Sequence, residues 1–339
     1  MTNYSKRLSG WFLTLFILVW FYFIFAYYIP HTGEDFTEDV RFVIVKKGDN
    51  LGKIASNLSS LDVITSTFDF KLFATLFGKS TKMKSGRYAI SNDYAIYDII
   101  KVISKGEAAP FNVTIPEGFT LKEIGDLLQS EIGIDIEQFD KIVNNAIAID
   151  SISSKAANLE GFLAPSTYNF FYNENPQTVV DKMRDHFFES LPDSFEIKAA
   201  ALGLTFYEAA TLASLIEEEA MVDGERPIIS SVYLNRLNKR WRLECDPTVI
   251  YALGGLDRPL YKNDLKLDSP YNTYKYFGLP PGPISNPGVK SLYAAINPSN
   301  DTFMFFVARG DGSHVFTRNI NDHINAVNRA RRNRRSAQN

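Results

Sequence analysis

Thr205–Met221 reads TFYEAATLASLIEEEAM and is the most regularly patterned segment of this 339-residue chain. Thr205 and Glu208 have the spacing of a capping box, in which each side chain bonds the other residue's backbone N–H at a helix start. At about 100° per residue, the apolar residues that follow fall on one face, which predicts an amphipathic helix packed against a core. These apolar residues are Ala209, Leu212, Ala213, Ile216 and Ala220.

Three consecutive glutamates, Glu217 to Glu219, end this predicted helix. Glu218 points away from the apolar face and is expected to be a solvated charge. Glu217 and Glu219 lie roughly 80° to either side of the centre of that face, so both are expected to be half-buried. Burial raises the pKa of a carboxyl group, as a general acid near neutral pH requires. Helix geometry alone does not choose between Glu217 and Glu219 as the reacting group.

The bulk composition excludes several kinds of site. A net charge of −3 indicates no nucleic-acid partner, and the single cysteine, Cys245, excludes an intrachain disulfide framework. The four histidines are scattered without zinc-ligand spacing, and there is no phosphate-binding glycine loop and no nucleophile-elbow serine. We therefore expect neither a metal nor a cofactor.

The 19 residues Trp11–Ile29 contain no charge. At about 1.5 Å per residue they nearly cross a hydrocarbon core of roughly 30 Å, with Trp11 and Tyr28 near the two interfaces. Basic residues precede this run and acidic residues follow it, which predicts a cytoplasmic N-terminus and an extracytoplasmic body held at the cell inner (plasma) membrane. A cleavable signal peptide is the alternative, but no small-x-small cleavage site follows the run.

An internal echo links Val43–Leu58 to Val113–Leu128. Each copy has a β-rich run, then a turn glycine (Gly48 or Gly118), then apolar residues at helical spacing, which predicts strand, turn and helix. A further strand and helix are expected between the two copies, at 88–91 and 94–104. The first copy resembles a LysM domain, a small fold that binds N-acetylglucosamine-containing glycans such as peptidoglycan. A packing domain without sugar binding is the alternative interpretation.

Seven ordered segments, together with the anchor, resemble the endolytic murein transglycosylases, the YceG-like family, over nearly the whole chain. They are LEGFLAPSTY (159–168), LASLIEEEA (212–220), SVYLNRL (231–237), DPTVIYAL (246–253), YNTY (271–274), GLPPGPISNPG (278–288) and FFVARGDGSHVF (305–316).

The resemblance implies a lytic transglycosylase whose catalytic residue is the first glutamate of the helical segment, Glu217. Such an enzyme uses one carboxyl group as acid and then as base, and the 6-hydroxyl of N-acetylmuramic acid as nucleophile. The resemblance also implies peptidoglycan as substrate and penicillin-binding synthases as partners. Ser166 stands where this family commonly has Asp, which argues against an acidic role there. Glu218 stands where it commonly has Lys, so the glutamate triplet is partly accidental.

Further candidates for the site come from the same segments. Glu160 and Asp246 are candidates for a second carboxylate, although a helix cap is the favoured role of Asp246. The irregular stretch 269–288 offers aromatic faces and polar edges for sugar, and His314 lies in a predicted hairpin strand near the site. The candidate substrate-binding residues are Glu160, Asp246, Thr248, Tyr271, Asn272, Thr273, Tyr274, Asn286 and His314.

The combined prediction is an α+β protein with an N-terminal transmembrane helix, a LysM-like α+β module and a mixed helical and β catalytic domain. The predicted parts are a cytoplasmic tail (1–10), an anchor (11–29), a linker (30–40), the LysM-like module (41–150), the catalytic domain (151–330) and a basic tail (331–339). Three functions compete with the transglycosylase: a non-catalytic peptidoglycan-binding scaffold, a muramidase-type hydrolase, and a soluble lyase of a small cytoplasmic metabolite. The predicted anchor argues against the last.

Overall fold

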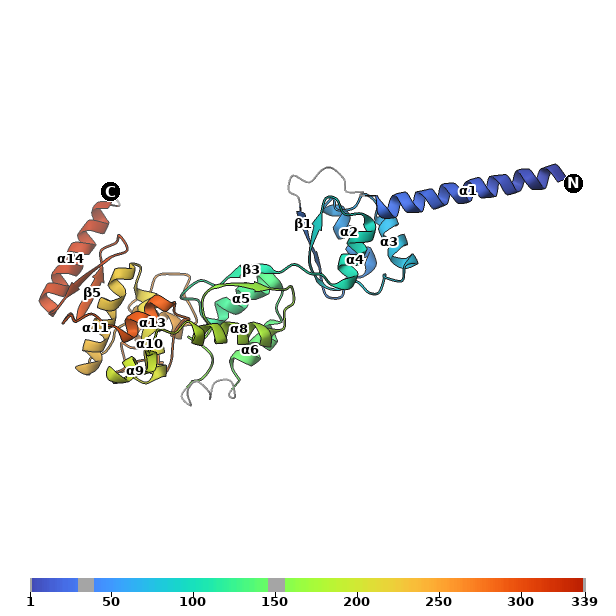
Figure 1. Ribbon diagram of the computed structural model, residues 1–339. Helices are drawn as coiled ribbons and strands as arrows, with labels where there is room; N and C mark the ends of the chain where they lie inside the picture. Colours follow the sequence, from blue (N-terminus) through green and yellow to red (C-terminus); the bar gives the residue numbers. More distant parts are fainter. Residues whose placement is uncertain (1, 30–39, 146–155, 338–339) are drawn as a thin grey trace. The chain divides into compact units, whose positions relative to one another are not determined.

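The computed structural model describes residues 2–29, 40–145 and 156–337 (Figure 1). The chain forms two compact units, one of Met1–Asn112 with Asn169–Glu174 and one of Val113–Tyr168 with Asn175–Asn339. The predicted domain boundary at residue 150 lies outside the described residues, as does the predicted linker apart from Val40. The two units divide at residue 112, directly before the second copy of the internal echo.

The N-terminal unit contains the helix α1 (Thr2–Tyr28) and a strand–helix–helix–strand motif. The motif consists of β1 (Val40–Val45), α2 (Leu51–Ser60), α3 (Thr67–Leu76) and β2 (Gly86–Ser91), and α4 (Ile96–Lys105) follows. The strands β1 and β2 pair antiparallel, with Val43 opposite Tyr88, and both of these side chains are fully buried. The strand and helix predicted between the two copies are confirmed as β2 and α4.

The C-terminal unit begins with the second copy, which has the same order of elements. β3 (Phe111–Thr114) is followed by α5 (Leu121–Ile132) and α6 (Ile136–Val143), and β4 (Thr167–Phe170) pairs with β3. Gly48 and Gly118 occupy the same place in the two copies and have φ values of +88° and +82°. Only glycine adopts such a turn without strain, so the echo in the sequence is confirmed as a repeat of one backbone motif.

Helices dominate the rest of the C-terminal unit. They are α8 (Pro176–Glu189), α9 (Phe195–Ala201), α10 (Phe206–Glu219), η1 (Asp223–Glu225), α11 (Arg226–Asn238), α12 (Asp246–Ala252), η2 (Asp264–Lys266), α13 (Val289–Ile296) and α14 (Ile320–Ala337). The predicted hairpin is confirmed as the antiparallel pair β5 (Phe305–Ala308) and β6 (His314–Thr317). The chain is therefore α+β, with short two-stranded sheets.

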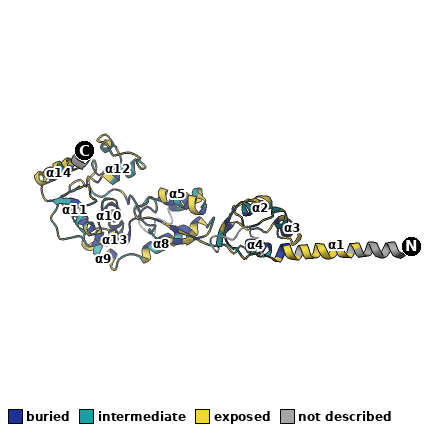
Figure 2. Ribbon diagram, turned by 90° about the horizontal axis from the view of Figure 1, so that it is seen from above, coloured by how far each residue is buried: buried dark blue, intermediate teal, exposed yellow. Residues whose placement is uncertain are grey.

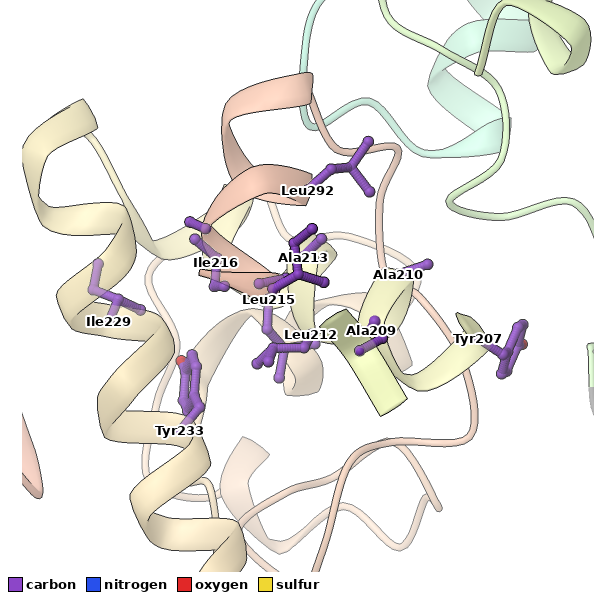
Figure 3. Close-up of a cluster of buried hydrophobic side chains, with 14 of the residues drawn as sticks. Tyr207, Ala209, Ala210, Leu212, Ala213, Leu215, Ile216, Ile229, Tyr233 and Leu292 are labelled. Carbon is purple, nitrogen blue, oxygen red and sulfur yellow. The ribbon is translucent and has the colours of Figure 1, made fainter. Parts of the chain in front are cut away.

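The helix α10 lies at the centre of the C-terminal core, where it packs against α11 and α13 (Figure 3). The predicted capping box is present, since Thr205 Oγ1 accepts from Glu208 N and Glu208 Oε2 accepts from Thr205 N. The prediction of an amphipathic helix was wrong in one respect. Tyr207 and every residue from Ala209 to Ile216 are buried, so the helix is enclosed on all sides before its three glutamates. A helix surrounded by other elements has no face for solvent, whatever its pattern.

Most of the described residues of α1 from Trp11 to Phe25 are exposed, and most of them are large and apolar (Figure 2). Near its end, the ring of Tyr27 stacks on Phe77 at 4.7 Å between centroids and packs against Phe73 at 4.9 Å. Over the described residues, no single helix combines the length and the hydropathy of a membrane span, and only the bent pair α9 and α10 does so jointly.

Candidate active site

Glu217 is held in place at the end of α10 by two donors. Its Oε1 accepts from Nη1 of Arg226 at 2.9 Å, and its Oε2 accepts from the backbone N–H of Gly288 at 2.8 Å. The side chain is 6% exposed, so both contacts lie largely out of water. Arg226 also binds Asp223 through Nε at 3.2 Å and the hydroxyl of Ser291. This environment stabilises negative charge on Glu217 and fixes its direction.

Glu218 is exposed, and its carboxyl group lies close to the turn after β3. A Cβ built on Gly118 would lie 3.0 Å from Glu218 Oε1, so the turn after β3 closely approaches this carboxylate. Burial by the surrounding atoms raises the pKa of Glu218 to about 7; nearby Ser285 opposes the rise, while Glu217, Glu123 and Glu219 add to it. The Glu218 carboxyl group is therefore partly desolvated, although the residue as a whole is exposed.

Glu219 turns into the protein. Its Oε1 accepts from the hydroxyl of Tyr233 at 3.2 Å, and burial raises the pKa of its carboxyl group, against the effect of a hydrogen bond with Cys245. The predicted directions of the three glutamates are confirmed, with Glu218 exposed and its two neighbours partly buried. The carboxyl of Glu219 contacts core side chains, so the structure favours a packing role for it.

Glu160 and Asn286 form the centre of a buried hydrogen-bond network. Glu160 accepts from the N–H of Leu121 at 3.0 Å, from Nδ2 of Asn286 at 3.0 Å and from the hydroxyl of Tyr251 at 3.3 Å. Burial raises the pKa of Glu160 to about 8, although these donors oppose the rise. Asn286 Oδ1 accepts from the N–H of Leu163 at 2.9 Å. The network joins α5 to the loop that supplies Gly288, so Glu160 and Asn286 help to hold that loop in place.

Asp246 is hydrogen-bonded to the irregular stretch 269–288. The hydroxyl of Tyr274 donates to Asp246 Oδ1 at 2.5 Å, and burial raises the pKa of Tyr274. The predicted cap role of Asp246 was wrong: Cys245 is the N-cap of α12, and Asp246 is the first helical residue. Behind it, Thr248 Oγ1 lies 2.9 Å from Thr273 Oγ1, and both threonines are buried.

The remaining candidates also make internal contacts. Asn272 is fully buried, and its Nδ2 donates to the carbonyls of Leu265 and Leu267. Tyr271 is half-buried and packs against Tyr251 with the ring centroids 5.0 Å apart. His314 is 9% exposed, and its Nδ1 lies 2.7 Å from Oε2 of Glu225.

No group of three or more potential metal-ligating side chains occurs within residues 2–29, 40–145 and 156–337. A cavity of about 480 Å³ is present at the opposite end of α10, lined by Tyr207, Glu208, Thr211 and the loop that contains Leu279. It includes none of the predicted site residues.

Comparison with known proteins identifies the family. Residues 43–329 match the model of the YceG-like family, which is most of the chain. The chain belongs to the YceG-like family. This YceG-like chain is 33% identical over 301 residues to an endolytic murein transglycosylase of Bacillus subtilis, and the match covers 83% of this chain and 82% of that protein. It is 28% identical to a protein of the same name from Streptococcus pneumoniae, over 83% of this chain and 58% of that one.

The crystal structure of a YceG-like protein from Listeria monocytogenes has the same fold. Its TM-score to this chain is 0.59 at 29% sequence identity, and the match covers 85% of this chain and 99% of that one. The overall α+β architecture described above is thus that of a YceG-like protein.

Sequence reasoning missed three contributors to the site of this YceG-like chain. Arg226, nine residues after Glu217, pairs with it because η1 turns the chain back at the end of α10. Ser285 and Gly118 approach Glu218 from distant parts of the sequence. Gly118 is the turn glycine of the internal echo and Ser285 lies in the segment 278–288, but neither pattern placed its residue beside Glu218. Of the predicted site residues, Glu217 lies at the end of α10, and the others mainly make internal contacts in the segments around it.

Proposed function

We propose that this YceG-like protein is an endolytic murein transglycosylase and that Glu217 is its reacting carboxyl group. Two curated relatives carry that name, and one of them matches across most of both chains. The observation that carries the choice of Glu217 is its fixed position, because Arg226 and the N–H of Gly288 hold both carboxylate oxygens at the buried end of α10. A reacting group must be held in one direction by its surroundings.

In the proposed reaction, Glu217 first donates a proton to the oxygen that bridges N-acetylmuramic acid and N-acetylglucosamine. The bond from the anomeric carbon to this oxygen breaks, and the N-acetylglucosamine side leaves as an alcohol. Glu217 then takes a proton from the 6-hydroxyl of the muramic acid residue, whose oxygen bonds to the anomeric carbon. A 1,6-anhydro ring forms, and Glu217 regains its proton, so one carboxyl group suffices where hydrolysis needs two.

The partners of Glu217 suit its role as the conjugate base in this reaction. Its carboxylate forms during bond cleavage, and the guanidinium group and the backbone N–H stabilise that charge. When Glu217 carries the proton, Arg226 keeps its ion pair with Asp223 and its hydrogen bond to Ser291. The buried cation therefore retains partners in both protonation states.

We also propose that α1 anchors the protein in the inner (plasma) membrane, with the N-terminus in the cytoplasm and the catalytic unit outside. The exposed apolar side chains of α1 support this proposal, because soluble surfaces rarely carry a continuous apolar patch of this kind. An anchored enzyme would act on nascent glycan strands beside penicillin-binding synthases and would end their elongation. The strand–helix–helix–strand motif from β1 to β2 supports a LysM-like contact with peptidoglycan.

The decisive experiment compares two neighbouring glutamates. Full-length protein in detergent is incubated with peptidoglycan, and the products are identified by mass spectrometry. We expect fragments ending in 1,6-anhydro-N-acetylmuramic acid from wild type, and a loss of about a thousandfold or more in Glu217→Gln, which cannot transfer the proton. Glu219→Gln is the matched control and is expected to stay within about fivefold of wild type, since its carboxyl contacts core side chains.

Other outcomes would support other functions. Reducing-end products from wild type would indicate a muramidase-type hydrolase. Sedimentation with peptidoglycan and no cleavage would indicate a scaffold. Activity that survives in Glu217→Gln and disappears in Glu219→Gln would assign the reaction to Glu219.

A further inference from the structure

The turn after β3 contacts the end of α10. Gly118 N donates to the carbonyl of Asn286 at 3.0 Å, and Asn286 N donates to the carbonyl of Phe119 at 2.9 Å. These two bonds fix the turn against the loop that supplies Ser285 and Gly288. The position of the turn relative to that loop is therefore set by backbone hydrogen bonds.

The two copies of the repeat differ in what surrounds this turn. Among the described residues, no atom beyond the chain neighbours of Gly48 lies within 4 Å of a Cβ built on it in the first copy. In the second copy, the corresponding atom on Gly118 would lie 3.0 Å from Glu218 Oε1 and 3.8 Å from Glu217 Cγ. The same backbone motif is thus open in one copy and part of the candidate active site in the other.

Ser285 supplies a second, independent observation. Its side chain is fully buried, and its hydroxyl makes no hydrogen bond of normal geometry within the described structure, although it lies near enough to Glu218 to lower that residue's pKa. A buried polar atom without a regular partner is uncommon and often marks a functional position. Glu218 itself is exposed, and no cation of the described residues lies within ion-pair distance of it.

We propose that the turn Glu117–Phe119, together with Glu218 and Ser285, forms a sugar-binding subsite directly beside Glu217. The subsite would take an N-acetylhexosamine residue of the glycan strand, whose hydroxyl and amide groups donate to Glu218. Ser285 would orient the Glu218 carboxylate, and Gly118 would leave the space that the sugar needs. The inference rests on the proposed function, because it names part of the substrate of the same site.

A binding experiment separates this subsite from catalysis. Full-length Glu217→Gln protein is titrated with the hexasaccharide of N-acetylglucosamine, and Gly118→Ala or Gly203→Ala is added to the same background. Both substitutions place a side chain at a similar positive φ, +82° and +76°, so their intrinsic backbone strain is matched. We expect Gly118→Ala to weaken binding about tenfold and Gly203→Ala less than about twofold, because only the first crowds the carboxylate.

Two further variants avoid backbone strain. Ser285→Ala is expected to leave the melting temperature unchanged or higher, since it removes a buried hydroxyl without a regular partner, and still to weaken hexasaccharide binding. In the active background, Glu218→Gln is expected to raise KM more than it lowers kcat, as the loss of a ground-state contact does.

Equal affinities of the Gly118→Ala, Ser285→Ala and parent proteins would overturn the subsite. This result stays distinct from failure of the proposed function, which is judged by whether wild type releases 1,6-anhydro ends. If wild type cleaves peptidoglycan and Glu218→Gln leaves KM unchanged, the proposed function stands and the subsite is contradicted. If Gly118→Ala weakens binding but wild type releases no 1,6-anhydro ends, the subsite stands and the proposed function is contradicted.

Discussion

At the residue scale, three adjacent glutamates differ because each meets a different neighbour. Glu217 meets a guanidinium group, Glu218 a glycine turn and Glu219 a tyrosine hydroxyl. Helix periodicity sets their directions about 100° apart, but the surrounding elements set their chemistry. The fixed position of Glu217 supports its proposed role, and the surroundings of Glu218 support a contact with sugar.

Glu160 gives a pH-dependent prediction at the same scale. Its pKa is raised from an ordinary 4.5 to about 8 by burial, so the folded state keeps a proton that the unfolded chain releases. The stability from this group is full below about pH 4.5 and is lost as the pH rises toward 8. We expect the unfolding free energy of wild type, relative to Glu160→Gln, to fall on the order of 2 kcal/mol between pH 5 and pH 8.

Thermal unfolding of both proteins across this range measures the difference. Other titrating groups, Glu218 among them, are present in both proteins and cancel in the comparison. A difference that stays constant or widens with rising pH would contradict a protonated Glu160.

At the element scale, close approach between loops holds the site together. Gly161, in the segment that carries Glu160, has a φ of +86°, and a Cβ there would lie 2.5 Å from Cγ of Pro283. The proline ring cannot rotate away from such a contact. The loop 283–288, which supplies Ser285 and Gly288, thus depends on a glycine at position 161.

We expect Gly161→Ala to destabilise the C-terminal unit by about 2–4 kcal/mol, from positive-φ strain plus overpacking against proline. Gly203→Ala is the matched control, because Gly203 has a φ of +76° and a Cβ built on it would meet no atom within 4 Å in the part of the chain that the structure describes, its chain neighbours aside. The control should cost only about 1 kcal/mol in chemical denaturation. Equal losses in the two variants would show that the contact with Pro283 is unimportant.

At the scale of the whole molecule, the chain combines an exposed apolar helix, one copy of the repeat in the N-terminal unit and a second copy built into the catalytic unit. The second copy contributes Gly118 to the candidate site, whereas a Cβ built on Gly48 of the first would meet no atom of the described, non-adjacent residues within 4 Å. This arrangement supports different roles for the two copies: the first copy is free to bind the glycan strand, and the second helps to shape the site.

Membrane attachment is the prediction that belongs to this scale. We expect the full chain to sediment with membranes and to resist extraction by high salt, because apolar burial does not depend on ionic strength. Protein lacking residues 1–29 should be found in the soluble fraction, with thermal unfolding of the remaining units retained apart from the contacts of Tyr27. Release of the full chain by salt alone would argue against an α1 anchor.

The amino-acid sequence by itself determined the local features of this protein. The capping box at Thr205, the repeated strand–turn–helix, the hairpin around 309–313 and the directions of the three glutamates follow from neighbours within a few residues. Local spacing is enough for these features, because hydrogen bonds and side-chain periodicity over one or two turns define them.

Only the tertiary structure decided which of these features meet. The amide of Asn286 donates to the carbonyl of Phe119, 167 positions earlier, and places the second repeat beside α10. The same long-range packing encloses α10 on all sides and puts the unit boundary at residue 112. Burial and partner choice depend on contacts between distant segments, and local periodicity carries no information about which segments those are.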